Sequence, residues 1–106
     1  MRRVRVGLAA VALASLASCA GPHVPPVTPQ QAQAAQAHWP GMTVAELDRG
    51  RSLYLGRCSA CHDLVPPERY SAAEWPGYIA KMKERAHLGD EDARAVEAFL
   101  GSASGR

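Results

Sequence analysis

The hydrophobic and polar positions divide the chain into three parts. Residues 6–17 are an unbroken run of small and apolar residues, and residues 20–42 contain no Asp, Glu, Lys or Arg. From residue 43 onward, apolar residues recur every three or four positions among charged ones, a pattern typical of amphipathic α-helices. This part has no strand-like alternation of apolar and polar residues. The pattern therefore predicts an all-α folded unit at residues 43–106.

The first predicted helix covers about residues 43–57. Thr43 and Glu46 have the spacing of a capping box, in which a hydroxyl and a carboxylate cap the first turn. Another helix follows Gly89, where three consecutive acidic residues favour the positive end of the helix dipole. The apolar faces consist of Leu47, Gly50, Leu53 and Tyr54 in the first helix and of Ala93, Val96, Phe99 and Leu100 in the last.

A middle helix is predicted at about residues 71–86, with Ser71 and Glu74 as its capping box. Pro76 conflicts with that start, because proline lacks the amide hydrogen that the second helical turn needs. Two solutions remain open. Either the helix begins near Trp75 with Pro76 in its first turn, or it is kinked.

The distribution of charge excludes one class of function, and the composition indicates that the folded unit needs an additional stabilising group. The chain has 12 Lys and Arg against 10 Asp and Glu, but three of the arginines lie in the first five residues. Beyond them no basic stripe is present that could neutralise phosphates, which excludes nucleic-acid binding. With one Phe, two Trp and three Tyr in 106 residues, a domain of this size needs a staple such as a disulfide, metal or cofactor.

The N-terminus has the properties of an export signal. Arginines at positions 2, 3 and 5 precede the apolar run, which is shorter than the about 20 residues that cross a bilayer. Residues 16–19 resemble the lipobox of bacterial lipoproteins. The resemblance implies a signal peptide at residues 1–18 and an acylated Cys19 that anchors the protein on the periplasmic side of a bacterial membrane. Ala20, which is not an aspartate, favours the outer membrane.

Residues 19–42 are predicted to form a tether between the lipid anchor and the folded unit. Five of the eight prolines lie here, and proline at this density opposes both helix and sheet. Residues 30–37 are rich in Gln and Ala but too few for a stable isolated helix, so one or two turns are expected at most. This interpretation leaves Trp39 free to fold back onto the domain.

Cys58, Cys61 and His62 form the pattern that attaches haem c, with two residues between the cysteines and the histidine directly after the second. After the first helix, both thiols can reach the two vinyl groups of one porphyrin, and the imidazole becomes the proximal iron ligand. A zinc site would need a second Cys/His pair, and a thioredoxin-like redox pair would need a βαβ context. The sequence shows neither, so one covalent haem c is the predicted cofactor.

The motif is part of a longer resemblance to small class I-type cytochromes c, over about residues 48–100. The residues that carry it are Gly50, Tyr54, Cys58, Cys61, His62, Pro66, Pro67, Trp75, Met82, Phe99 and Leu100. The resemblance implies a compact fold of three to four helices around one haem, whose first and last helices cross where Gly50 and Tyr54 meet Phe99. It also implies one-electron transfer between redox protein partners, and a short loop between His62 and Met82.

The sixth iron ligand is left open among three possibilities. Of the three methionines, Met82 follows the haem motif and shares a helix face with Trp75, Ile79 and Ala86. A methionine on such a face is otherwise ordinary core filling. The resemblance favours Met82, whereas His87 would give a bis-histidine haem and an open position would bind small ligands.

Neighbouring residues complete the expected haem site. A ligating histidine usually donates its second ring N–H to a carbonyl, and the rigid turn at Pro66 is the candidate acceptor for His62. Arg69, Tyr70 and Trp75 are candidate hydrogen-bond donors to the haem propionates. Pro66, Tyr70 and Trp75 are therefore counted among the predicted haem-binding residues.

Together these features predict a membrane-anchored mono-haem cytochrome c that carries electrons and is not an enzyme. Two alternatives remain open. One is a haem sensor or redox enzyme whose iron has an open or weak sixth position. The other is a fixed cytochrome subunit of a respiratory complex.

Overall fold

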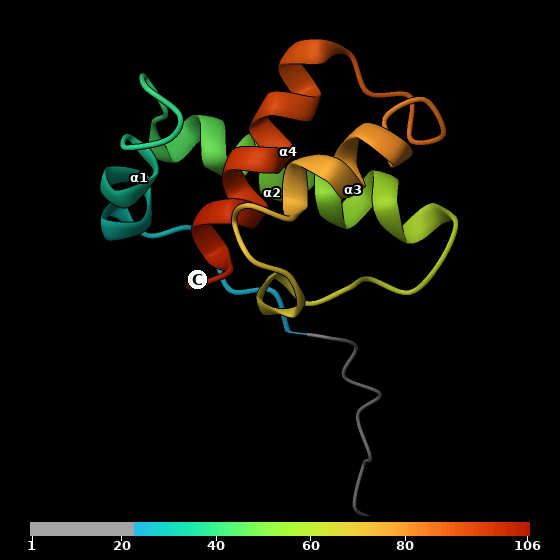
Figure 1. Ribbon diagram of the computed structural model, residues 1–106, viewed down its shortest axis with the longest axis horizontal. Helices are drawn as coiled ribbons and strands as arrows, with labels where there is room; N and C mark the ends of the chain where they lie inside the picture. Colours follow the sequence, from blue (N-terminus) through green and yellow to red (C-terminus); the bar gives the residue numbers. More distant parts are fainter. Residues whose placement is uncertain (1–22) are drawn as a thin grey trace, which may run out of the picture.

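The computed structural model describes residues 23–106, which form four α-helices and no strand (Figure 1). The helices are α1 (Pro29–Ala35), α2 (Val44–Arg57), α3 (Trp75–Met82) and α4 (Asp90–Ala103), with single 3₁₀ turns at Cys58–Ala60 and Pro67–Arg69. The predicted all-α fold class is thereby confirmed. Of the helices within residues 23–106, none is both long enough and apolar enough to cross a membrane. The predicted signal peptide and Cys19 lie outside the described residues.

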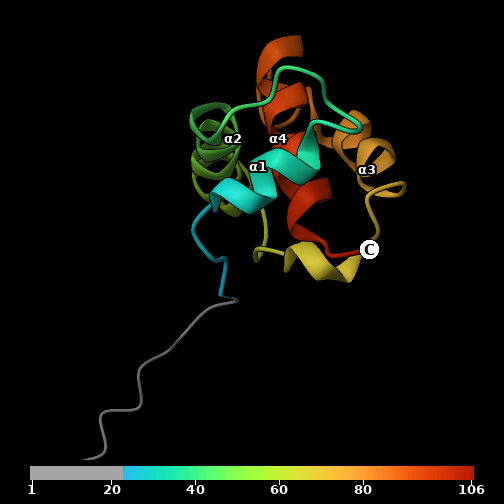
Figure 2. The same cartoon turned by 90° about the vertical axis from the view of Figure 1, so that its left-hand side faces the viewer.

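Helices α2 and α4 cross at the centre of the fold (Figures 1 and 2). Gly50 permits the crossing, because a β-carbon at this position would overlap the carbonyl oxygen of Ala95 on α4. One turn further along α2, the ring of Tyr54 packs against that of Phe99, with 6.3 Å between the ring centroids. The contact predicted between the first and last helices is therefore confirmed. Fully buried side chains at the crossing include Leu47, Val96 and Leu100.

We expect Gly50→Ala to lower the free energy of unfolding by about 1–3 kcal/mol, because the added methyl group would push α2 away from α4. Gly56, in the same helix, is the matched control, since a β-carbon there would meet no atom within 4 Å. Gly56→Ala should raise the free energy of unfolding by about 0.5–1 kcal/mol, because alanine restricts the unfolded chain. Urea titration measures both changes, and equal effects at the two positions would contradict the close crossing.

The ends of α2 follow from its sequence. Thr43 Oγ1 accepts a hydrogen bond from the backbone amide of Glu46 at 3.1 Å, as the predicted capping box requires. At the other end, the amide of Cys58 donates to the carbonyl of Tyr54 and caps the helix. The helix therefore ends where the haem-attachment motif begins.

Helix α3 begins at Trp75 with Pro76 in its first turn, which is the first of the two solutions left open by the sequence. Ser71 and Glu74 make both hydrogen bonds of a capping box. The Ser71 amide donates to Glu74 Oε2 at 2.7 Å, and the Glu74 amide donates to Ser71 Oγ at 3.3 Å. These bonds close the turn that precedes the helix.

The predicted end of this helix at residue 86 is wrong, because α3 ends at Met82. The chain continues in turns, in which the Ala86 amide donates to the carbonyl of Met82 at 2.9 Å. His87 then adopts a φ of +55°, a left-handed conformation that an α-helix does not contain. The reversal at this residue directs the chain into α4.

Residues 24–42, which we call the N-terminal strap, pack against α2 and α4, so the prediction of an extended tether is wrong for this segment. Helix α1 lies in the strap, and Figure 2 shows it in front of α2 and α4. The exposed fractions of Val24, Ala35 and Met42 are only 6%, 1% and 1%. The strap covers part of the core with these side chains, while most of its other residues are exposed.

Hydrogen bonds from charged side chains fix the strap to both central helices. Arg51 of α2 donates to the carbonyls of Val24 and Pro25 at 2.9 and 3.0 Å, and Arg94 of α4 donates to that of Pro40 at 3.0 Å. Irregular backbone leaves such carbonyls without regular partners, and the arginines supply them. Trp39 folds back as predicted, since a β-carbon on Gly101 of α4 would overlap its ring.

Candidate functional site

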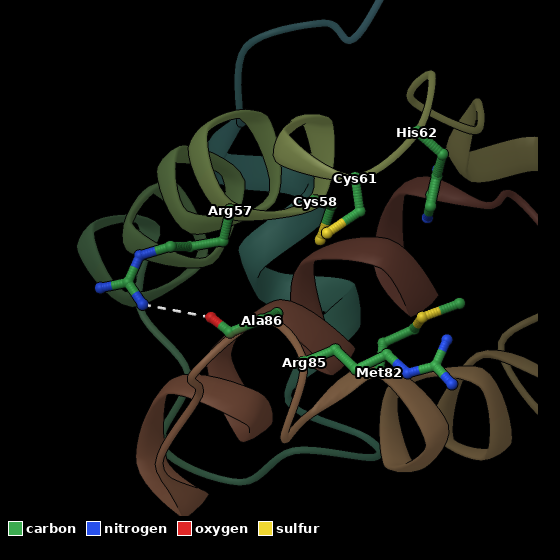
Figure 3. A pocket seen from close by; sticks show the side chains of 7 residues that line it. All are labelled: Arg57, Cys58, Cys61, His62, Met82, Arg85 and Ala86. Carbon is green, nitrogen blue, oxygen red and sulfur yellow. Dashed lines mark hydrogen bonds between the residues drawn. The ribbon is translucent and has the colours of Figure 1, made fainter.

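The two cysteines of the motif open into one cavity at the end of α2. Cys58 is the C-cap residue of α2. The 3₁₀ turn at Cys58–Ala60 follows and places Cys61 next to it. Figure 3 shows the two sulfur atoms side by side, with Met82 projecting from the opposite wall. The cavity has a volume of about 180 Å³, and its lining consists of Arg57, Cys58, Cys61, His62, Met82, Arg85 and Ala86.

A second cavity of about 190 Å³ adjoins the first and shares Cys58, His62 and Met82 with it. Its remaining lining is apolar or aromatic and consists of Tyr54, Val65, Tyr70, Trp75, Tyr78 and Ile79. Tyr70 stacks on Tyr78 with 4.0 Å between ring centroids and meets the edge of Trp75 at 5.1 Å. The two cavities together form a groove with thiols at one end and a rigid aromatic wall at the other.

The environment of the thiols opposes dithiol redox chemistry. Burial, and secondarily the neighbouring Cys61, raises the pKa of the Cys58 thiol above its ordinary value. Cys58 also sits at the carboxyl end of α2, where the helix dipole disfavours a thiolate. Reactive thiols of thioredoxin-like proteins have the opposite surroundings and a lowered pKa. Neither Cys58 nor Cys61 is in a disulfide among the described residues.

A zinc site finds no support in the geometry either. Within residues 23–106, no three or more His, Cys, Asp or Glu side chains gather in a way that could hold a metal ion. Cys58 and Cys61 therefore lack the second pair of ligands that tetrahedral zinc requires.

His62 is exposed at the mouth of both cavities. Its Nδ1 lies 2.7 Å from the carbonyl oxygen of Asp63, so a proton on Nδ1 leaves the Nε2 lone pair available to a metal. The predicted partner, Pro66, is not this acceptor, since the contact of Nδ1 is with Asp63, and the Pro66 carbonyl accepts a hydrogen bond from the amide of Arg69 at 3.0 Å. The carbonyl of Asp63 follows His62 directly in the chain, so the imidazole reaches it without the longer loop that a contact with Pro66 would need.

Two buried aromatic side chains hold the loop that follows the motif. The hydroxyl of Tyr54 donates to the carbonyl of Val65, and the indole N–H of Trp75 donates to the carbonyl of Pro67 at 2.8 Å. An indole has one donor, so the predicted bond from Trp75 to a haem propionate would require this contact with Pro67 to break. Trp75 supplies part of the groove wall, where the predicted Tyr70 also lies.

Of the candidate sixth ligands, Met82 alone lines the two cavities. It is the last residue of α3 and partly buried. Met42 is buried in the strap, and His87 is exposed on the turn after α3. Arg69 is exposed outside both cavities.

Some lining residues were not predicted from the sequence. Tyr78 lies one helical turn after Trp75, so the spacing of the aromatic residues could have indicated it. Arg57 and Arg85 carry no such signal, because an arginine near a helix end is usually a solvated residue.

Comparison with curated proteins finds a similarity to the cytochrome c-type protein TorY of Haemophilus influenzae. The two chains are 31% identical over 51 residues, which are 48% of this chain and 14% of that protein. The chain thus spans only a small part of the relative that it matches. No protein-family model matches the chain, and no solved structure matches it. The similarity supports a c-type cytochrome.

Proposed function

We propose that the chain is a mono-haem cytochrome c that transfers single electrons between redox protein partners. The observation that carries the proposal is the convergence of two thiols, an imidazole and a thioether on one groove with an aromatic wall. These groups come from the end of α2, the following loop and the end of α3. The partial similarity to a cytochrome c-type protein supports the same assignment.

The residues of the groove fit haem c. Cys58 and Cys61 would each add a thiol across one vinyl double bond, with sulfur bonding to one carbon and hydrogen passing to the other. Haem c would supply the one-electron change between Fe(III) and Fe(II). The aromatic wall would exclude water and lower the local dielectric constant around it.

His62 and Met82 are the proposed axial ligands. The imidazole is oriented by its contact with the carbonyl of Asp63, which also fixes the tautomer that leaves Nε2 free. Met82 faces the same groove from α3, and a neutral thioether stabilises Fe(II) relative to Fe(III). This ligand pair suits an electron carrier of raised reduction potential.

One absorption spectrum of the purified protein, oxidised and then reduced, tests the proposal. A low-spin haem that is reversibly reduced and does not bind carbon monoxide is expected. Rapid carbon monoxide binding would instead favour the sensor or enzyme with an open iron. Stable co-purification with other haem proteins would favour a fixed subunit of a complex.

We also propose that acylation of Cys19 anchors the protein at a membrane, with the outer membrane favoured by Ala20. Cys19→Ser should release the protein from the membrane fraction or block its processing, since stable anchoring needs the acyl chains. The haem spectrum should be unchanged. Mass spectrometry of the mature N-terminus detects the lipid, and a Cys19→Ser protein that stays on membranes without acyl chains would overturn the anchor.

A further inference from the structure

The groove has two walls that belong to different parts of the chain. One wall is the end of α2 with Cys58 and Cys61, and the other is the end of α3 with Met82. Between the second wall and α4 lies the turn at residues 83–89, in which His87 has the left-handed backbone conformation. The position of Met82 relative to the cysteines depends on the packing of α3 against α4 and on what holds this turn.

Arg57 joins the two walls. Its Nη1 donates a hydrogen bond to the carbonyl of Ala86 at 3.2 Å, which Figure 3 shows. The same nitrogen donates to the carbonyl of His87 at 3.1 Å. Carbonyls in a turn outside the helices lack regular backbone partners, and one guanidinium nitrogen satisfies two of them here. Arg57 is also covalently adjacent to Cys58, so the bonds start from the attachment motif itself.

The connection continues as far as Met82. The amide of Ala86 donates to the carbonyl of Met82 at 2.9 Å, while the carbonyl of Ala86 accepts from Arg57. Two hydrogen bonds thus link the residue before the first cysteine to the candidate sixth ligand. The second bond lies within the turn, so the bond from Arg57 is the one that spans the groove.

We propose that Arg57 is a positioning residue that holds the Met82 wall against the cysteine wall and so keeps the thioether on the iron. The inference rests on the proposed function, because it concerns the ligand of a bound haem. Loss of the Arg57 bonds would let the turn at residues 83–89 move outward with the end of α3. The fraction of molecules without Met82 on the iron would then rise.

A comparison with the neighbouring Arg85 distinguishes the positioning role of Arg57 from an effect of its positive charge alone. Arg85 lines the same cavity with the same charge. Its side chain makes no hydrogen bond to another residue in the part of the chain that the structure describes. Arg85→Gln therefore removes one positive charge from the groove and leaves the bonds to the turn intact.

The experiment uses the full-length protein with haem and the variants Arg57→Gln, Arg57→Lys and Arg85→Gln. The fraction of oxidised protein without a thioether–iron bond is measured by the near-infrared charge-transfer band during warming. Arg57→Gln should raise this fraction about three- to tenfold at a given temperature, which is the range expected for one or two such bonds. It should also speed carbon monoxide binding to the reduced protein. Arg57→Lys, which keeps a positively charged donor on a long side chain, should restore part of the loss, and Arg85→Gln should raise the fraction clearly less than Arg57→Gln does.

Equal effects of Arg57→Gln and Arg85→Gln would overturn the inference in favour of charge alone, and so would an Arg57→Gln protein that behaves as the wild type. Amide hydrogen exchange over residues 83–88 is the second measurement. Arg57→Gln should increase exchange there, and unchanged exchange would show that Arg57 does not hold the turn. A wild-type protein without the thioether band would instead refute the proposed Met82 ligation, while the exchange measurement still decides the role of Arg57.

Discussion

Replacing Cys58 and Cys61 together by alanine should abolish the retention of haem by the denatured chain. Each thioether is a covalent bond, so the wild-type protein should still stain for haem after denaturing electrophoresis. The variant has no sulfur left at the end of α2, where both thiols open into the same cavity. Any haem that it binds would be held by contacts that denaturation destroys.

Single variants and a matched control sharpen this test. Cys61→Ala should lower the yield of haem protein, and His62→Ala should prevent a stable low-spin haem because the proximal ligand is lost. Ser59 lies between the two cysteines, is exposed, and donates to the carbonyl of Leu55 at 2.7 Å. Ser59→Ala should leave the haem stain unchanged. Haem that leaves the denatured wild-type chain would refute covalent attachment.

Replacing Met82 by alanine should remove the near-infrared thioether band of the oxidised protein completely. It should also lower the reduction potential, since the thioether that stabilises Fe(II) is gone. The vacated sixth position should bind carbon monoxide in the reduced state, which the wild type should not. Absorption spectroscopy and a redox titration measure all three changes.

The matched variant is His87→Ala, which removes the rival ligand. His87 is exposed on the turn after α3 and lines neither cavity, so its replacement should leave the band and the potential close to those of the wild type. An intact spectrum in Met82→Ala together with an altered one in His87→Ala would identify a bis-histidine haem and refute the proposed ligand.

Local signals in the sequence predicted most of the helices, because caps and helical periodicity act over a few residues. Thr43 and Glu46 marked the start of α2, and Pro76 limited the start of α3 to Trp75 or a kink. The contact of Gly50 with α4 was also predictable, but only through the resemblance to small cytochromes c. Nothing near Gly50 in the sequence identifies the helix that lies against it.

The errors concern features that depend on tertiary contacts. The strap was expected to be a tether because it is rich in proline and uncharged. It packs instead against α2 and α4, whose residues, Arg51 and Arg94 among them, lie far away in the sequence. The bond from Trp75 to Pro67 was missed for a similar reason. The single N–H of Trp75 is engaged by the carbonyl of Pro67, which only the folded loop brings within reach.

The residues of the site likewise divide into those that the sequence predicts and those that depend on tertiary contacts. Cys58, Cys61 and His62 were predictable because their spacing along the chain is itself the chemical requirement. Arg57 was not, since its partners are the backbone carbonyls of Ala86 and His87, and backbone atoms leave no mark in a sequence.

The packing of the strap sets how far the haem groove could travel from a lipid surface. Four residues lie between Cys19 and the buried Val24. A fully extended chain spans at most about 3.6 Å per residue, so the proposed acyl anchor and the folded domain would be separated by less than about 20 Å. A flexible chain as long as residues 20–42 would have allowed about 70 Å in an extended polyproline-like form. Val24 is in turn fixed to Arg51, two helical turns before Cys58 on α2. The reach of such a protein from the membrane would be about the size of the domain itself, so membrane-held electron donors and acceptors would have to lie within about that distance.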